Sequence, residues 1–147
     1  TNIEHHQAHG TSHEMYKGIL DDHAQGVFNG RVLVKPKAEK TSSKQMNKNL
    51  LLSQEAVINT KPLLEIFHND VKCNHGATIG RLDANQLFYL RSRGIDLDRA
   101  RSILTYAFAD EVLHSISLPS LRKKLEQNIF SKLMSRANLQ DEFGGIE

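Results

Sequence analysis

The chain has 147 residues, a length at which one domain or two small units sharing a core is expected. Apolar residues make up 39% and charged residues 24%, which excludes a disordered or fibrous protein. The net charge of +2 is too small to indicate a nucleic-acid partner, and the sequence has no apolar run of about 18 residues that would span a membrane. The single cysteine, Cys73, excludes an internal disulfide and predicts a reducing, cytoplasmic compartment.

Up to Leu82 the apolar residues come in short runs separated by turn-forming residues. Runs such as Arg31–Val34, Leu63–Phe67 and Ala77–Ile79 are bounded by Asn, Gly or Pro, for example at Asn29–Gly30. These runs predict an all-β half with strands of three to five residues. Strands this short favour a parallel β-solenoid over a barrel or a sandwich, although the sequence has no strict repeat period.

Polar side chains alternate along one segment of this half. Gln45, Asn47 and Asn49 precede Leu50 at every second position. Stacked amides of this kind can form a polar ladder at a solenoid corner. The alternative is a solvated loop, because the stretch from Lys35 to Lys48 contains five lysines. The sequence leaves both interpretations open and favours the loop.

After Leu82 the pattern predicts helices. Asp83 with Gln86 forms a capping-box arrangement at the start of the first helix, and Gly94 stands where a C′ residue is expected. A second helix is predicted to begin near Asp96, with an apolar stripe that continues for about five turns. The domain prediction is therefore a β unit over 1–82 and a helical unit over 83–147.

A third helix is predicted to begin between Ser117 and Pro119, because Pro is tolerated in a first helical turn. Its apolar residues recur every four positions, at Leu121, Leu125, Ile129 and Leu133. From Ala137 onward the tail is predicted to fray. Three such helices carry more apolar surface than they bury among themselves. Whether the remainder packs on the β half or binds a partner stays open at this stage.

The segment Lys72–Gly76 contains the most suggestive pair of side chains. In an extended strand, Cys73 and His75 lie on the same side, and both residue types are good ligands for iron, zinc or copper. Two ligands are too few for a closed zinc or cluster site. The alternative is a buried cysteine acting as a small hydrophobe beside a surface histidine.

Other chemistry is weakly supported. The group His5, His6, His9 and His13 is either a metal-binding tract or, as we favour, polar positions on short strands and turns. The sequence contains no nucleophile elbow, dinucleotide fingerprint or phosphate loop. An enzyme would therefore depend on Cys73 alone.

Several stretches in order carry a family resemblance. Asp70–Gly80 and Leu87–Ile95, preceded by Val27–Gly30, Asn47–Ser53 and Asn59–Ile66, resemble the C-terminal part of the SufB/SufD family of iron–sulfur cluster assembly scaffolds. The resemblance runs from about His5 to Leu133. The runs at 76–80 and 88–94 favour the SufD branch over the SufB branch.

The resemblance implies a right-handed parallel β-helix fragment followed by a small helical domain. It implies a scaffold without catalysis that pairs with SufB and docks the SufC ATPase, and that holds a transient iron–sulfur cluster shared with SufB. His75, with Cys73, would bind the cluster, and the implied SufC contacts are Phe88, Tyr89, Arg91 and Arg93. The chain itself would bind no nucleotide, nucleic acid or membrane.

Two other functions are weighed against the scaffold. A metal- or thiol-dependent enzyme would use Cys73 and His75, and a carbohydrate-binding or carbohydrate-cleaving β-helix would need exposed aromatics and paired carboxylates, of which the chain offers few. Because the family pairs two paralogues through strand edges, the isolated chain is expected to form a homodimer.

Overall fold

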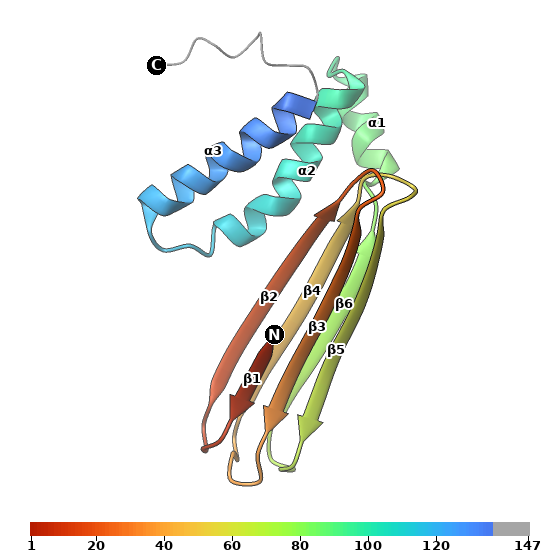
Figure 1. Ribbon diagram of the computed structural model, residues 1–147. Coiled ribbons are helices and arrows are strands. Elements are labelled where there is room, and N and C mark those ends of the chain that lie inside the picture. The colour runs from red at the N-terminus through yellow and green to blue at the C-terminus, as the bar shows by residue number, and fades with distance from the viewer. Residues whose placement is uncertain (137–147) are drawn as a thin grey trace. The chain divides into compact units, whose positions relative to one another are not determined.

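The computed structural model describes residues 1–136 and contains two compact units, one of residues Thr1–Arg81 and one that begins at Leu82 (Figure 1). The first unit is built of strands and the second of helices, so a parallel β part followed by a helical part is correctly predicted. The fraying predicted from Ala137 onward lies outside the described residues. Among residues 1–136, the model contains no helix long and apolar enough to cross a membrane.

The β unit, all of which is described, contains two parallel three-stranded sheets, ordered β1-β3-β5 and β2-β4-β6. Consecutive strands alternate between the sheets, so each strand pairs with the next but one. Thr11, for example, pairs with Ser42, which pairs with Lys72. The strands are β1 (Asn2–His5), β2 (Thr11–Leu20), β3 (Gln25–Val34), β4 (Ser42–Leu51), β5 (Val57–Ile66) and β6 (Lys72–Gly80).

The predicted strand length of three to five residues is wrong for every strand except β1. The other strands span nine or ten residues, and the expected turn residues Asn29–Gly30 lie inside β3. Gly30 serves close packing instead of a turn, because a Cβ there would lie 2.5 Å from Nε2 of Gln45. Parallel pairing of β3 with β5 holds Asn29 and Gly30 in the sheet.

The core of the β unit lies between the sheets. Val32 and Val34 of β3 are fully buried together with Ala38, and partly buried apolar side chains from both sheets and their connections pack on them: Ile3, Leu64, Val71 and Cys73. Side chains at alternate positions of each strand point to this interior. The core therefore includes the predicted site residue Cys73.

The solvated-loop interpretation of Gln45, Asn47 and Asn49 is wrong. All three lie within β4 and are at most 3% exposed, so they form a polar row along one strand instead of a ladder at a corner. Lys44 and Lys48 alternate with them on the opposite face of β4. The Nδ2 group of Asn49 donates a hydrogen bond to Oδ1 of Asn47 at 2.7 Å. The many lysines of this segment indicated a solvated loop, so the buried row was not predicted from the sequence.

Within the described residues the helical unit contains α1 (Ala84–Ser92), α2 (Leu97–Leu113) and α3 (Pro119–Arg136). The predicted caps of α1 are confirmed. Asp83 accepts hydrogen bonds from the backbone N–H groups of Asn85 and Gln86, and Asp96 accepts one from Arg99. Gly94 follows α1 with a φ of +87°, a left-handed conformation that favours glycine.

The helical unit exposes large apolar side chains. The buried positions of α2 are mostly small or polar: Ala100, Ser102, Thr105, Ala109 and Leu113. Two members of the predicted stripe, Leu97 and Ile103, are about 40% exposed instead. No residue of α1 is buried, and Phe88 of α1 is 73% exposed. The apolar surface predicted for these helices is thus largely accessible.

Candidate functional site

Cys73 and His75 lie on β6, an edge strand that pairs only with β4. Cys73 is the register partner of Ser43, and His75 is the register partner of Gln45. Since Ser43 and Gln45 are both buried, Cys73 and His75 belong to the same inward face of the sheet. Because β6 is an edge, Cys73 is only partly buried and His75 is exposed.

The Cys73 side chain is partly buried in the core and partly accessible to solvent. It packs on the cluster of Val32, Val34 and Ala38. Burial raises the pKa of the Cys73 thiol, and a backbone hydrogen bond from Ser43 offsets part of that rise. A reactive cysteine needs a lowered pKa, so this environment disfavours the thiol-dependent enzyme.

The His75 imidazole is free in the described part of the chain, where it forms no hydrogen bond or ion pair. Its neighbour Gln45 is fully buried and donates a hydrogen bond from Nε2 to Oε2 of Glu14 at 2.6 Å. The other end of that amide, Oε1 of Gln45, is buried without a hydrogen-bond partner among the described residues. Glu14 was not identified from the sequence, and Gln45 was identified only as a polar residue. That the two lie in line with His75 can be seen only from the strand register.

The donors on this face are too few for a complete metal centre. Among the described residues, no group of three or more His, Cys, Asp or Glu side chains is placed to hold a metal ion. The chain therefore offers one imidazole and one thiol at an exposed strand edge. Further ligands would have to come from outside the described residues.

The histidines near the start of the chain do not gather into a site. His5 is buried, and its Nε2 is hydrogen-bonded to Oγ of Ser12 at 2.9 Å. The Nε2 atom of His6 lies 3.0 Å from a carboxylate oxygen of Glu4. His13 lies in β2, and His9 lies in the connection between β1 and β2. This distribution agrees with polar positions on strands and turns.

Exposed apolar side chains lie on β6 and at the end of β5. Ile79 of β6 is 50% exposed, and Ile66 at the end of β5 and Phe67 after it are 41% and 60% exposed. Like β6, β5 is an edge strand of its sheet, so both present unpaired backbone N–H and C=O groups. Such an edge favours pairing with another strand.

The predicted contact residues on α1 and at its C-cap form two pairs. Phe88 and Arg91 line the same hollow of about 530 Å³, with Ala84, Leu87, Ser92 and Leu97. The Arg93 guanidinium lies 5.3 Å from the centre of the Tyr89 ring, a cation–π distance. Phe88 and Tyr89 are both more than half exposed. Apolar and arginine side chains therefore share one accessible helix.

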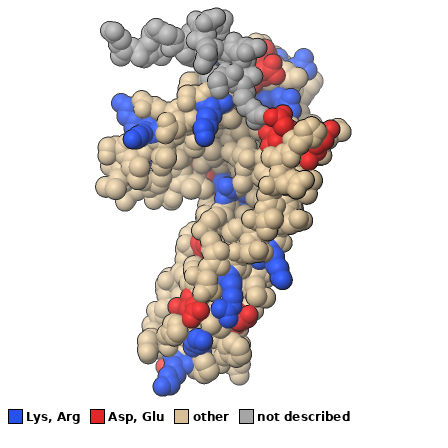
Figure 2. All heavy atoms as spheres, viewed as in Figure 1, with Lys and Arg blue, Asp and Glu red and all other residues tan. Residues whose placement is uncertain are grey.

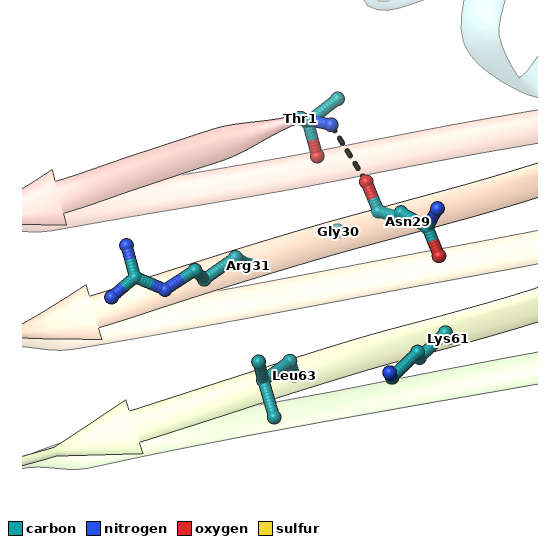
Figure 3. A pocket seen from close by; sticks show the side chains of 6 residues that line it. All are labelled: Thr1, Asn29, Gly30, Arg31, Lys61 and Leu63. Atoms are coloured by element: carbon teal, nitrogen blue, oxygen red, sulfur yellow. Dashed lines mark hydrogen bonds between the residues drawn. The ribbon is translucent and has the colours of Figure 1, made fainter.

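A smaller hollow of about 230 Å³ lies on the β1-β3-β5 sheet, lined by Thr1, Asn29, Gly30, Arg31, Lys61 and Leu63 (Figure 3). Within this lining, the Thr1 amino group donates a hydrogen bond to the carbonyl oxygen of Asn29 at 2.7 Å. Arg31 is paired with Glu65. The lining contains no thiol, imidazole or carboxylate, so this hollow offers no cluster ligand.

An open parallel sheet edge with two soft donors, together with an exposed apolar and arginine-bearing helix, is typical of a protein–protein interaction module. Comparison with known proteins gives the family. Residues 1–108 match the SufBD core domain of the SUF system for iron–sulfur cluster assembly, and the chain belongs to this SufBD family.

The chain is similar to an iron–sulfur cluster assembly SufBD family protein of Synechocystis, with 50% identity over 81% of this chain. It is also similar to proteins named SufD, with 41% identity over 89% of this chain for Escherichia coli and 34% over 79% for Bacillus subtilis. It covers 26%, 31% and 26% of these three relatives, so it spans between a quarter and a third of their length.

Proposed function

We propose that the chain is part of a scaffold subunit of the SUF iron–sulfur cluster assembly machinery, with no catalytic reaction of its own. In this proposal the β5–β6 edge pairs with SufB, and the helical unit docks the SufC ATPase. Membership of the SufBD family supports it. The observation that carries it is that His75, Cys73 and the exposed Ile79 lie on the same edge strand, β6.

The cluster is the cargo of this proposed scaffold. His75 supplies an imidazole ligand from this chain, and SufB supplies the thiolate ligands that this chain lacks. A histidine ligand raises the potential of a cluster relative to full cysteine ligation, which suits a cluster that is passed on. Cys73 is the second donor, partly buried against the core with its thiol pKa raised by that burial.

The test is anaerobic purification of the complex of this subunit with SufB and SufC, followed by measurement of bound iron and sulfide. His75→Ala should leave folding and SufC binding intact and should lower cluster content sharply. Cys73→Ala is the matched variant two positions away, and a milder loss is expected. Wild-type iron and sulfide in His75→Ala would refute the ligand role of His75.

The β unit is proposed to form the C-terminal coils of a right-handed parallel β-helix. The alternation of consecutive strands between two parallel sheets supports this reading. A crystal structure of a longer relative of this chain should show further strands continuing the β1-β3-β5 and β2-β4-β6 sheets on the side away from β5 and β6.

Without SufB, the isolated chain is proposed to form a homodimer through the β5–β6 edge. Exposed edge strands can pair with a strand of another chain, and charged side chains that point inward on such a strand prevent this pairing. Light scattering should report a dimer for the wild type and a monomer for Ile79→Lys, while Val27→Lys, which changes an exposed valine of β3, should remain dimeric. A wild-type monomer at high concentration would contradict this proposal.

A further inference from the structure

We propose that Gln45 is the positioning residue for His75, with Oε1 of Gln45 accepting a hydrogen bond from the imidazole N–H when the other ring nitrogen binds the cluster. This inference rests on the proposed function of His75. It assigns a role to the row Glu14–Gln45–His75, whose members are register partners on β2, β4 and β6.

The orientation of the Gln45 amide follows from its neighbour. A carboxylate accepts hydrogen bonds, so the amide end that lies 2.6 Å from Oε2 of Glu14 is the nitrogen. The oxygen and nitrogen of a carboxamide point away from each other. With Nε2 held toward β2, Oε1 is turned away from Glu14.

The Gln45 oxygen is an unusual atom in this interior. Gln45 is 0% exposed, yet Oε1 has no hydrogen-bond partner among the described residues. By contrast, the next amides along the row satisfy each other, since Nδ2 of Asn49 donates to Oδ1 of Asn47 at 2.7 Å. Leaving a buried acceptor unpaired is unfavourable, so such an atom in a folded protein calls for a missing donor.

His75 can provide that donor. It is the register partner of Gln45 on β6 and belongs to the same inward face. Its ring forms no hydrogen bond in the described part of the chain, so an N–H remains available. The imidazole is exposed at the edge and is free to turn toward Gln45 when a partner covers β6.

A hydrogen bond from the ring N–H to an amide oxygen has a defined chemical consequence. It fixes which nitrogen carries the proton and leaves the lone pair of the other nitrogen for iron. Glu14 in turn holds the Gln45 amide in place through its hydrogen bond, and the fixed amide then sets the orientation of the exposed His75 ring. Loss of an outer-shell partner of this kind typically lowers metal affinity about 10–100-fold.

The experiment compares Gln45→Met with Asn47→Leu in the complex with SufB and SufC. Gln45→Met keeps the length of the side chain and removes the acceptor. Asn47→Leu removes an equally buried amide on the same strand, but its register partner is Ala77 and not His75. Cluster loss to an iron chelator should become at least about tenfold faster in Gln45→Met, and it should be unchanged in Asn47→Leu.

A spectroscopic readout separates positioning from stability. With ¹⁵N-histidine in this subunit, pulsed electron paramagnetic resonance of the reduced cluster should show a coordinated nitrogen in the wild type that is absent in His75→Ala. The coupling should weaken or disappear in Gln45→Met. Unchanged coupling and unchanged chelator kinetics in Gln45→Met would overturn the positioning role while the ligand role of His75 stands. Wild-type spectra in His75→Ala would instead refute the proposed function.

A second variant tests the role of Gln45 if the Gln45→Met subunit fails to assemble with SufB and SufC. The exchange Glu14→Gln with Gln45→Glu preserves the amide–carboxylate hydrogen bond and presents a stronger acceptor to His75. The cluster should be retained with a shifted ¹⁵N coupling. A retained cluster with unshifted coupling, or loss of the cluster, would contradict the inference.

Discussion

The Arg31 guanidinium on β3 donates a hydrogen bond to the Glu65 carboxylate on β5 at 2.5 Å, and it also lies 3.6 Å from Glu4 on β1. One cation thus bridges the three strands of one sheet. Leu33 of β3 is the register partner of both Glu4 and Glu65, and its side chain is only 3% exposed. Figure 2 shows basic and acidic side chains intermixed over the visible face of the β unit, in keeping with such cross-strand pairing.

This bridge predicts a loss of stability in acid. The hydrogen bond from Arg31 holds the pKa of Glu65 below its ordinary value of 4.5, and the pKa of Glu4 is lowered chiefly by its hydrogen bond from Asn2. Because the folded pKa is below the unfolded one, the stabilisation is complete above the unfolded pKa and is lost as pH falls through the folded pKa. The midpoint of thermal unfolding should therefore drop as pH falls below about 4.5.

The variant Arg31→Met should flatten this acid dependence, since Glu65 then titrates near its ordinary pKa in both states. Lys61→Met is the matched control, because it removes a cation of the adjacent strand β5 that is not paired with Glu65. Equal acid dependence in the wild type and Arg31→Met would show that the bridge does not govern it.

A second prediction concerns Gly30, which faces the buried amide row. A Cβ at this position would lie 2.5 Å from Nε2 of Gln45 and 2.7 Å from the Phe28 ring. Gly30→Ala should therefore lower the free energy of unfolding by about 1–3 kcal/mol, as overpacking does in well-packed interiors. Urea denaturation measures the change.

Gly80→Ala provides the control for Gly30, since nothing lies within 4 Å of a Cβ built there. Its effect should stay within about 0.5 kcal/mol. A Gly30→Ala protein as stable as Gly80→Ala would mean that the interior relaxes around the added methyl group.

The sequence predicted the helical unit better than the β unit for a physical reason. Helix caps are local, so Asp83, Asp96 and Gly94 could be assigned from their own neighbours. Strand length in a parallel sheet depends on partners that are distant in sequence, such as Ser42 for Thr11. Asn29–Gly30 therefore indicated a turn, although pairing with β5 and a hydrogen bond from Thr1 to the Asn29 carbonyl keep it in a strand.

The candidate site was predictable in part. The i, i+2 spacing correctly placed Cys73 and His75 on one face of a strand. The spacing could not show that Gln45 and Glu14 lie in the same row, because that depends on the register of β2, β4 and β6. The lysines around Gln45 indicated a solvated segment, whereas alternation directs the lysines outward and the amides inward.

A third prediction concerns the Cys73 thiol. Since burial raises its pKa, only a small fraction is thiolate at neutral pH. Alkylation by iodoacetamide should be slower than for a cysteine in a short peptide, and the pH at which the rate reaches half its maximum should be higher. Alkylation faster than the peptide at neutral pH would contradict this and favour the thiol-dependent enzyme.

The last prediction concerns docking of SufC on α1. Phe88 is 73% exposed and shares a hollow with Arg91, while Arg93 stacks on Tyr89 at 5.3 Å. An exposed aromatic beside arginines has the composition of an interface hot spot, in which truncation of an anchor costs about 2 kcal/mol or more. The combination of Phe88→Ser with Arg91→Glu and Arg93→Glu should therefore abolish SufC pull-down.

The control for SufC docking is Val27→Ser, which truncates an equally exposed apolar side chain on β3. Circular dichroism should show unchanged helix content in the triple variant, because Asp83 still caps α1 and its substituted side chains make no buried contacts. Loss of about 2 kcal/mol corresponds to a Kd roughly 30-fold weaker, which isothermal titration calorimetry resolves for Phe88→Ser alone. An unchanged Kd in the triple variant would place the SufC contact on other residues of the helical unit, such as the exposed Leu118 and Leu121.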